Sequence, residues 1–170
     1  MPYELSIIIV NWNGGSLLTK CVESIVNSAP KLTYEILIID NASADDSLVQ
    51  LRANTSAAAM IDSGQLRLVH NSENRGFGAA NNQAFALTES PFVFLLNLDT
   101  EVPPGTIDTL IEKLKADPKI GACGPRLLNA DGSVQVSVFF NPPRVWHTFM
   151  SQLWLYHVFP RGIRGEILLG

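Results

Sequence analysis

The chain has 170 residues, of which 46% are hydrophobic and 16% are charged, and its formal net charge is -4. This length suits a single domain with one substantial core, and the composition excludes a disordered chain. The mildly acidic balance, without any run of lysine or arginine, argues against nucleic acid as a partner. Anionic ligands stay open, because backbone amides and a metal ion can bind a phosphate without a basic surface.

The first 118 residues alternate short apolar runs with helical patterns. Strands are predicted at residues 5–10, 35–39, 66–69 and 92–96, where β-branched and other apolar residues crowd into short runs. Helices are predicted at residues 17–26, from about Asp46 with Ser43 or Asp45 as the cap, at 78–87, and from Pro103 to Asp117. This alternation predicts βαβ units over residues 5–118, in an α/β fold with a mostly parallel sheet and helices on both faces.

After this core the pattern changes. Residues 119–141 predict a hairpin, because Asp131-Gly132 separates two apolar arms. Residues 144–160 predict an aromatic helix that is apolar nearly all round, and its segment 145–159 needs a cover. We expect this cover to be absent sequence or a second copy of the chain, as in a homo-oligomer. The alternative is peripheral contact with a membrane, favoured by the flanking arginines.

Cysteine usage and hydropathy address the compartment. Cys21 and Cys123 lie in separate apolar runs and form no C-x-x-C pair, so we expect two buried, reduced thiols. No basic n-region stands at the start, and no stretch reaches the roughly 18 apolar residues of a membrane span. The predicted location is the cytoplasm, or the inner face of the membrane for a peripheral protein.

Polar residues follow all four predicted strands, at residues 11–15, 40–43, 71–78 and 97–101. Ligands of open parallel sheets bind beyond the carboxyl ends of the strands, so these segments predict a cleft for a polar, nucleotide-like ligand. Asn11 and Asn13 suit a turn as well as a ligand contact, whereas Trp12 between them suits stacking on a base. Asp40 either caps the next helix or accepts a hydrogen bond from a ribose or base, and we favour the ligand.

The third segment contains Arg75-Gly76, whose amides precede a helix and can meet a phosphate. As a dinucleotide fingerprint this segment is weak, because it has only G-x-G and follows the third strand. A nicotinamide-dependent oxidoreductase is therefore disfavoured. The three histidines, His70, His147 and His157, are scattered without partner spacing and are interpreted as structural.

Asn97 and Asp99 are the sharpest feature. Residues two apart on a strand point to the same side, and Glu101 extends the series. One carboxylate with one amide oxygen suits Mg²⁺ or Mn²⁺, which takes its remaining ligands from water and a diphosphate. The alternative is that Asp99 caps the following helix. Thr100 or Thr106 can do that equally well, so we favour the metal.

Four segments in this order resemble family 2 inverting glycosyltransferases of the GT-A fold. They are SIIIVNWN (residues 6–13), IIDNAS (38–43), NSENRGFGAANN (71–82) and LLNLDTEV (95–102). A fifth, IGACGPRLLNADGS (120–133), resembles the rhamnosyltransferase-like branch. The resemblance implies a UDP- or dTDP-sugar donor, a divalent cation, and transfer with inversion to the hydroxyl of a saccharide or lipid-linked acceptor.

The resemblance also implies roles for single residues. Val10 and Trp12 would contact the base, Asp40 would bind its imide or the ribose, and the loop at Arg75 would line the nucleotide. Asn97 replaces the first Asp of the family's D-x-D motif, and Asp99 would hold the cation. The full set of implied nucleotide-binding residues is Val10, Asn11, Trp12, Asn13, Asp40, Asn41, Arg75, Gly76 and Asn97, with Asp99 as the metal ligand.

One departure from the family is serious. Its general base is a carboxylate in a downstream acidic motif, and after Asn141 the one acidic residue is Glu166, in a different context. The catalytic base is therefore unknown, and the chain resembles a donor-binding half with an incomplete acceptor half, all within one nucleotide-sugar-binding domain over residues 1–170. Two functions stay open: a glycosyltransferase, and a catalytically silent module that binds nucleoside diphosphates.

Overall fold

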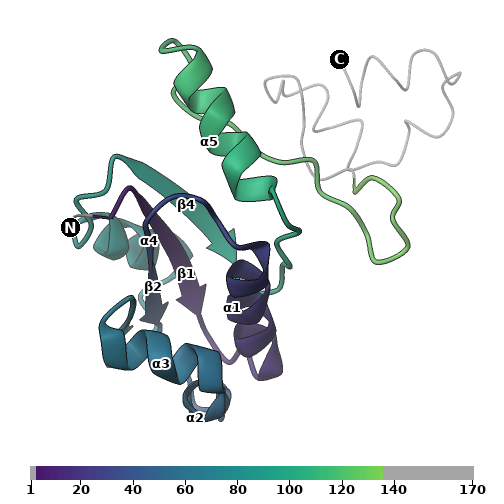
Figure 1. Cartoon of the computed structure of the whole chain (residues 1–170). Helices are drawn as coiled ribbons and strands as arrows, with labels where there is room; N and C mark the ends of the chain where they lie inside the picture. The colour runs from purple at the N-terminus through teal and green to yellow at the C-terminus, as the bar shows by residue number, and fades with distance from the viewer. Residues whose placement is uncertain (1–2, 136–170) are drawn as a thin grey trace, which may run out of the picture. The chain divides into compact units, whose positions relative to one another are not determined.

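The computed structural model describes residues 3–135. The chain divides into two units, Met1–Gly124 and Pro125–Gly170, and the first contains the sheet and its helices (Figure 1). Its elements are β1 (Leu5–Asn11), α1 (Ser16–Ser28), β2 (Tyr34–Asp40), α2 (Ser47–Ala53), α3 (Thr55–Ser63), β3 (Leu66–His70), α4 (Phe77–Phe85), β4 (Phe92–Asn97) and α5 (Thr106–Ala116). The predicted α/β fold is confirmed.

The four strands form one parallel sheet in the order β3-β2-β1-β4. Every residue of β1 is buried, as expected for a central strand covered on both faces. The register places Asn11 of β1 opposite Asp40 of β2, and Asp40 opposite His70 of β3. The carboxyl ends of these three strands therefore coincide, which aligns their terminal polar residues across the sheet.

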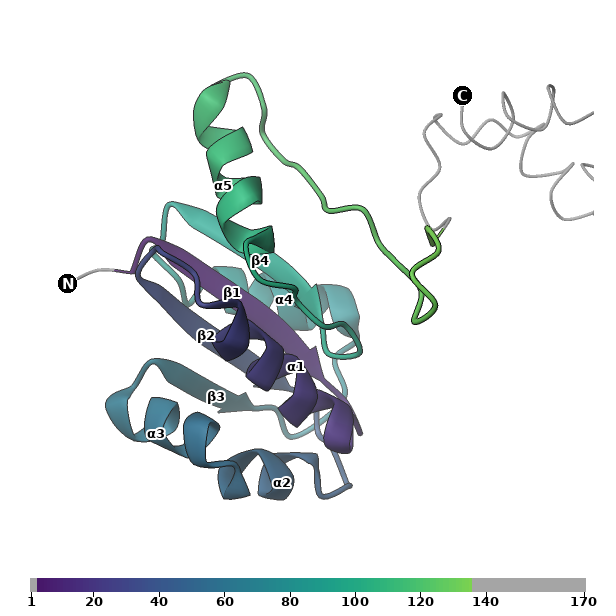
Figure 2. The ribbon, with the colours of Figure 1, turned by 45° about the vertical axis from the view of Figure 1, so that its right-hand side comes forward.

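Alternating side chains of the strands build two cores on opposite faces of the sheet. Figure 2 shows the helices α1 and α4 on these two opposite faces. On one face, Ile7, Ile9 and Ile38 pack with residues of α1, α2, α3 and α5. On the other face, Ile8, Val10, Leu37 and Ile39 pack with Ala80 and Ala84 of α4. The small alanines allow α4 to lie close against the strands, and because α4 follows β3 along the chain, its N-terminus lies at the carboxyl edge of the sheet.

The helix predicted from Asp46 is two helices, because Asn54 adopts an extended conformation between them. Its side chain accepts a hydrogen bond from the backbone of Ala57 and so begins α3. Of the two predicted caps of α2, Asp45 accepts from the backbone of Ser47, whereas the hydroxyl of Ser43 bonds to the loop after β1. The α5 helix begins after Gly105 without a side-chain cap, so Asp99 does not cap it.

The second unit is described only over residues 125–135. Antiparallel pairing of Leu128 with Val134 flanks Asp131-Gly132, as the hairpin prediction requires. The backbone N–H of Gln135 also donates to the carbonyl of Leu127 over 2.9 Å. The remainder of the hairpin and the aromatic helix at 144–160 lie outside the described residues.

Two further predictions concern the burial of the cysteines and the absence of a membrane span. Cys21 is buried in α1, whereas Cys123 is exposed in the extended segment after α5, so burial was predicted correctly for one thiol and wrongly for the other. Among residues 3–135, no helix has both the length and the apolar character needed to cross a bilayer.

Candidate functional site

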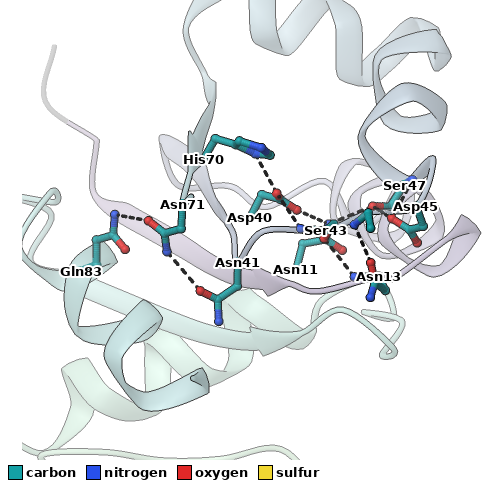
Figure 3. Close-up of polar contacts among 11 residues, drawn as sticks. Asn11, Asn13, Asp40, Asn41, Ser43, Asp45, Ser47, His70, Asn71 and Gln83 are labelled. Carbon is teal, nitrogen blue, oxygen red and sulfur yellow. Dashed lines mark hydrogen bonds and ion pairs between the residues drawn. The ribbon is translucent and has the colours of Figure 1, made fainter. Parts of the chain in front are cut away.

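A row of three polar residues crosses the carboxyl edge of the sheet (Figure 3). Asn11, Asp40 and His70 occupy matching positions at the ends of β1, β2 and β3. The Nδ2 of Asn11 donates to Asp40 Oδ1 over 2.7 Å, and His70 Nδ1 lies 2.7 Å from Asp40 Oδ2. We call these three residues the tip row. Each side chain in it fixes the orientation of its neighbour.

Asp40 is the centre of the tip row, and only 1% of its surface is exposed. Its Oδ2 also accepts from the backbone N–H of Ser43, which closes the turn after β2. A buried carboxylate is stable only when its oxygens are hydrogen-bonded, and here three donors surround it. Asp40 therefore orients the groups at the strand ends while staying buried, whereas the side chain of His70 is 64% exposed.

The position of Asn11 explains why residue 14 is a glycine. The amide oxygen of Asn11 is buried and has no hydrogen-bond partner within residues 3–135. A Cβ atom placed on Gly14 would lie 2.5 Å from this oxygen and 3.0 Å from a methyl carbon of Leu98. Only glycine fits at this position without displacing Asn11, whose Nδ2 is held by Asp40 and by the hydroxyls of Ser43 and Ser47.

Hydrogen bonds from side chains connect the loop after β1 to the loop after β2. Asn13 Oδ1 accepts from Ala44 N over 2.8 Å, and Asp45 Oδ2 accepts from Gly15 N over 2.8 Å. The hydroxyl of Ser47 donates to Asp45 over 2.6 Å. This hydroxyl, followed by backbone N–H donors, lowers the pKa of the exposed Asp45 carboxyl below its ordinary value. The two loops thus form one platform at the strand ends.

A second polar group lies on the α4 face. Asn41 Oδ1 accepts from Arg75 N over 3.0 Å and from Asn71 Nδ2 over 3.2 Å, and Asn41 Nδ2 donates to Asn74 over 2.6 Å. Gln83 of α4 donates to Asn71 over 3.0 Å (Figure 3). We call Asn41, Asn71, Asn74 and Gln83 the loop anchor, because together they tie the loop before α4 to β2.

The loop anchor presents two of the predicted nucleotide-binding residues. Arg75 is exposed, and Gly76 stands before α4 with a φ of 83°, a conformation that favours glycine. No side chain caps α4, so its first N–H groups are available at the carboxyl edge. Trp12, directly after β1, is 56% exposed, whereas Val10 of β1 is buried in the α4-side core.

At the end of β4 the strand stops at Asn97. Thr100 N and Thr100 Oγ1 both donate to the carbonyl of Asn97, so residues 97–100 form a turn. The strand alternation expected to carry Asn97 and Asp99 to one side therefore does not extend to Asp99. Both side chains are exposed. Burial first, and then the negative charge of Asp99, raises the pKa of the Cys21 thiol to about 12, which places Asp99 near α1.

The donors at this turn suit a hard divalent cation. Asp99 supplies a carboxylate and Asn97 an amide oxygen, the ligand types that Mg²⁺ and Mn²⁺ prefer. Within residues 3–135 there is no cluster of three or more His, Cys, Asp or Glu side chains that could hold a metal alone. The residues thus fit a cation that takes most of its ligands from a bound diphosphate and water.

Sequence reasoning missed several of these contacts. His70, interpreted as structural and without a partner, is the exposed end of the tip row. The signal was its position, since it follows Leu66 and Leu68 in the alternation and ends the third strand. Asn71, Asn74, Gln83 and Ser47 were not singled out. The Asn-rich segments at the strand ends were the one sequence feature that could have indicated these residues.

The model of a known family matches residues 6–161, described as glycosyl transferase family 2. The chain belongs to this family. Among curated relatives, the succinoglycan biosynthesis protein ExoU of Rhizobium meliloti is 33% identical over 112 residues, covering 66% of this chain and 31% of that protein. The N-acetylglucosaminyl-diphospho-decaprenol L-rhamnosyltransferase of Mycobacterium tuberculosis is 27% identical and covers 99% and 56%. This family 2 chain therefore spans between about a third and just over half of their lengths.

Solved structures of similar fold agree with the α/β architecture of this family 2 domain. The mannosyltransferase PcManGT from Pyrobaculum calidifontis, in complex with GDP-Man and Mn²⁺, has a TM-score of 0.62 and 24% identity, covering 71% of this chain and 34% of its own. The S. aureus TarS fragment 1–349 in complex with UDP-GlcNAc has a TM-score of 0.56 and 20% identity, covering 66% and 31%. At these identities the likeness shows the fold.

Proposed function

We propose that this family 2 chain binds a UDP- or dTDP-sugar along the carboxyl edge of its sheet and supports transfer of the sugar, with inversion, to an acceptor hydroxyl. The observation that carries the proposal is that buried and exposed side chains have different roles at this edge. Buried side chains of the tip row and the loop anchor hold the loops in place. The exposed groups above them suit a nucleotide and its diphosphate.

The exposed residues divide by chemistry. Trp12 offers an aromatic face on which a base can stack. Arg75, fixed through its backbone by Asn41, offers a guanidinium for the ribose or phosphates, and the uncapped start of α4 at Gly76 favours negative charge. Buried Asp40 contributes through the donors that it orients. Asn13 and Val10 shape the platform beneath.

Asp99, with Asn97 beside it, would hold a divalent cation on the diphosphate. Such a cation supplies Lewis-acid stabilisation of the charge that develops on the leaving group. The residues of the chain position the diphosphate for transfer of the sugar to the acceptor hydroxyl. The relatives' names, which include a decaprenol-linked acceptor and succinoglycan biosynthesis, support a lipid-linked or saccharide acceptor.

Calorimetric titration of the full chain with UDP, dTDP and NAD, with and without Mn²⁺, tests the donor site. We expect binding of at least one of the two pyrimidine diphosphates, strengthened by Mn²⁺, and none of NAD. Failure of both pyrimidine diphosphates to bind would overturn the proposal for this chain. Binding of NAD without metal would indicate the oxidoreductase that the glycine pattern disfavours.

A second function has its own support. The chain spans 31% and 56% of the two curated relatives, and after Asn141 its one acidic residue, Glu166, does not stand in the acidic motif that the resemblance implies for the general base. A module that binds nucleoside diphosphates without turnover would share every donor-site residue named above. Hydrolysis of a radiolabelled UDP-sugar separates the two, since release of free sugar at a rate above that of the Asp99→Ala variant requires catalysis.

A further inference from the structure

The chain contains one Asn-Gly pair, Asn13-Gly14, and this pair lies in the platform that the loops after β1 and β2 form. An asparagine loses its side-chain amide most readily before a glycine, because glycine has no Cβ to shield its backbone nitrogen. Asn13 is exposed, and its φ of 52° lies in the left-handed region that asparagine tolerates. Water therefore has access to its amide.

Loss of the amide proceeds through the backbone. Hydroxide removes the proton of the Gly14 N–H, and this nitrogen attacks the side-chain carbonyl carbon of Asn13. The new C–N bond closes a succinimide ring, and the amide nitrogen takes a proton from water and leaves as ammonia. A second water molecule opens the ring at either carbonyl. The products are an aspartate with the normal backbone and an isoaspartate, whose backbone runs through the former side chain.

Hydrogen bonds in the folded chain hold Asn13 away from this geometry. Its N–H donates to Ser43 Oγ over 2.9 Å, as the close-up shows, and its Oδ1 accepts from Ala44 N over 2.8 Å (Figure 3). Two residues further on, Gly15 N donates to Asp45 Oδ2 over 2.8 Å. The side chain of Asn13 is thus directed toward the loop after β2. The attack requires it to turn back onto its own backbone, so the contact to Ala44 must break first.

We propose that Asn13 is a site of spontaneous deamidation whose rate is controlled by the hydrogen bonds between the two loops. While these bonds are formed the reaction is blocked, and each local opening of the platform allows it. The observed rate is then the rate of the unfolded chain multiplied by the fraction of time that the platform is open. This inference goes beyond the proposed function and holds whether or not the chain binds a nucleotide.

The two products differ in their fit to the platform. Gly14 is buried, and a Cβ placed on it would lie 2.5 Å from the amide oxygen of Asn11 and 3.0 Å from a methyl carbon of Leu98. An isoaspartate inserts a methylene carbon into the backbone directly before this crowded residue. An aspartate keeps the backbone, and its carboxylate still accepts from Ala44 N. Formation of the isoaspartate should therefore leave the platform permanently open.

The rate is measured on the full chain at pH 8 and 37 °C. Mass spectrometry of the tryptic peptide 1–20 locates the change, and isoaspartyl methyltransferase detects the isoaspartate. We expect deamidation of Asn13 to be about tenfold slower or more in the folded chain than in urea. Asp45→Ala removes the acceptor of Gly15 N and should raise the folded rate about threefold or more. Asp62→Ala, which removes an exposed carboxylate of α3, is the matched control and should leave the rate unchanged.

Several outcomes would overturn the inference. Equal rates in the folded chain and in urea would remove the control by the two loops. Equal acceleration in Asp45→Ala and Asp62→Ala would show that charge, and not the hydrogen bond, sets the rate. If Asn13 reacts in urea but never in the folded chain, even in Asp45→Ala, the platform does not open and the site is lost. The signal itself should disappear in Asn13→Gln, and a signal that persists there belongs to another residue.

The fate of the products is tested separately. Ion exchange separates the isoaspartate form, whose urea unfolding midpoint should shift to lower concentration than that of the unmodified chain. Asn13→Asp carries the same new charge on a normal backbone and should keep a midpoint close to that of the unmodified chain. Equal midpoints for the isoaspartate form and Asn13→Asp would contradict the packing argument at Gly14.

Discussion

The backbone N–H of Arg75 donates to the side-chain oxygen of Asn41 over 3.0 Å, although 34 positions separate them in the chain. A side chain at the tip of β2 thus sets the path of the loop that follows β3. The same oxygen accepts from Asn71, and the amide nitrogen of Asn41 donates to Asn74. The placement of Arg75 depends on this one buried amide.

Replacing Asn41 with Ala should therefore loosen the loop before α4. We expect trypsin to cleave after Arg75 about fivefold faster or more, because the hydrogen bonds lost are those that hold the loop in place. Mass spectrometry of the early fragments gives the rate. Cleavage after Lys119, in the exposed segment beyond α5, serves as the internal control. Equal acceleration at both sites would mean global destabilisation instead.

Gly14→Ala should lower the free energy of unfolding by about 1–3 kcal/mol, because the new Cβ overlaps the amide oxygen of Asn11. Asn11 cannot move cheaply, since three oxygens hold its Nδ2. Urea unfolding followed by circular dichroism measures the change. Gly78→Ala is the matched control: nothing lies within 4 Å of its added Cβ, and a gain of up to about 1 kcal/mol is expected in this helix. Equal effects would show that Asn11 is not the obstacle.

The metal assignment predicts an asymmetry at the turn after β4. Asp99→Ala should weaken Mn²⁺-dependent UDP binding at least about tenfold, whereas Asn97→Ala should weaken it only a few-fold, because hard cations bind carboxylates more strongly than amides. Calorimetry with and without Mn²⁺ separates the metal-dependent part. Similar losses for the two variants would remove Asp99 from its role as the principal protein ligand.

The two thiols should differ in reactivity. Cys123 is exposed, whereas burial and the nearby charge of Asp99 raise the pKa of Cys21 to about 12. At pH 8 we expect one thiol to react rapidly with Ellman's reagent and the second only on unfolding, since the thiolate is the reactive form. Cys123→Ser should abolish the rapid phase. Rapid reaction of this variant would contradict the burial of Cys21.

The same pKa has a consequence for stability. The unfolded chain ionises Cys21 near the ordinary value of 9.0, and the folded chain only near 12. The contribution of the protonated thiol is therefore complete below pH 9 and is lost as the pH rises toward 12. Cys21→Ala should flatten this decline in melting temperature, because alanine does not titrate.

The strands were predictable because their surroundings are uniform. Residues 5–11 are buried on both faces, so the apolar run at residues 7–10 identifies this strand without knowledge of its neighbours. The break at Asn54 was not predicted, although Asn is a common cap, because an amphipathic pattern continues across it. Local patterns report burial more reliably than they report a single residue that interrupts a helix.

The site was predictable in outline and not in its contacts. Asp40 and Asn41 could be placed at a strand tip, but sequence does not reveal that β3 is the neighbour of β2, and the partner His70 follows only from that order. The turn at residues 97–100 likewise depends on the hydroxyl of Thr100 bonding back to Asn97. Contacts between segments far apart in the chain were the part that only the structure supplied.

The buried thiol of Cys21 bears on which ions the proposed site would accept. It lies near enough to Asp99 to respond to its charge, yet it stays protonated to a pH of about 12. A thiol without its anion is a poor ligand for soft metals such as zinc or cadmium. At this turn Asp99 and Asn97 therefore offer oxygen donors, and the protonated thiol of Cys21 is a poor sulfur ligand beside them.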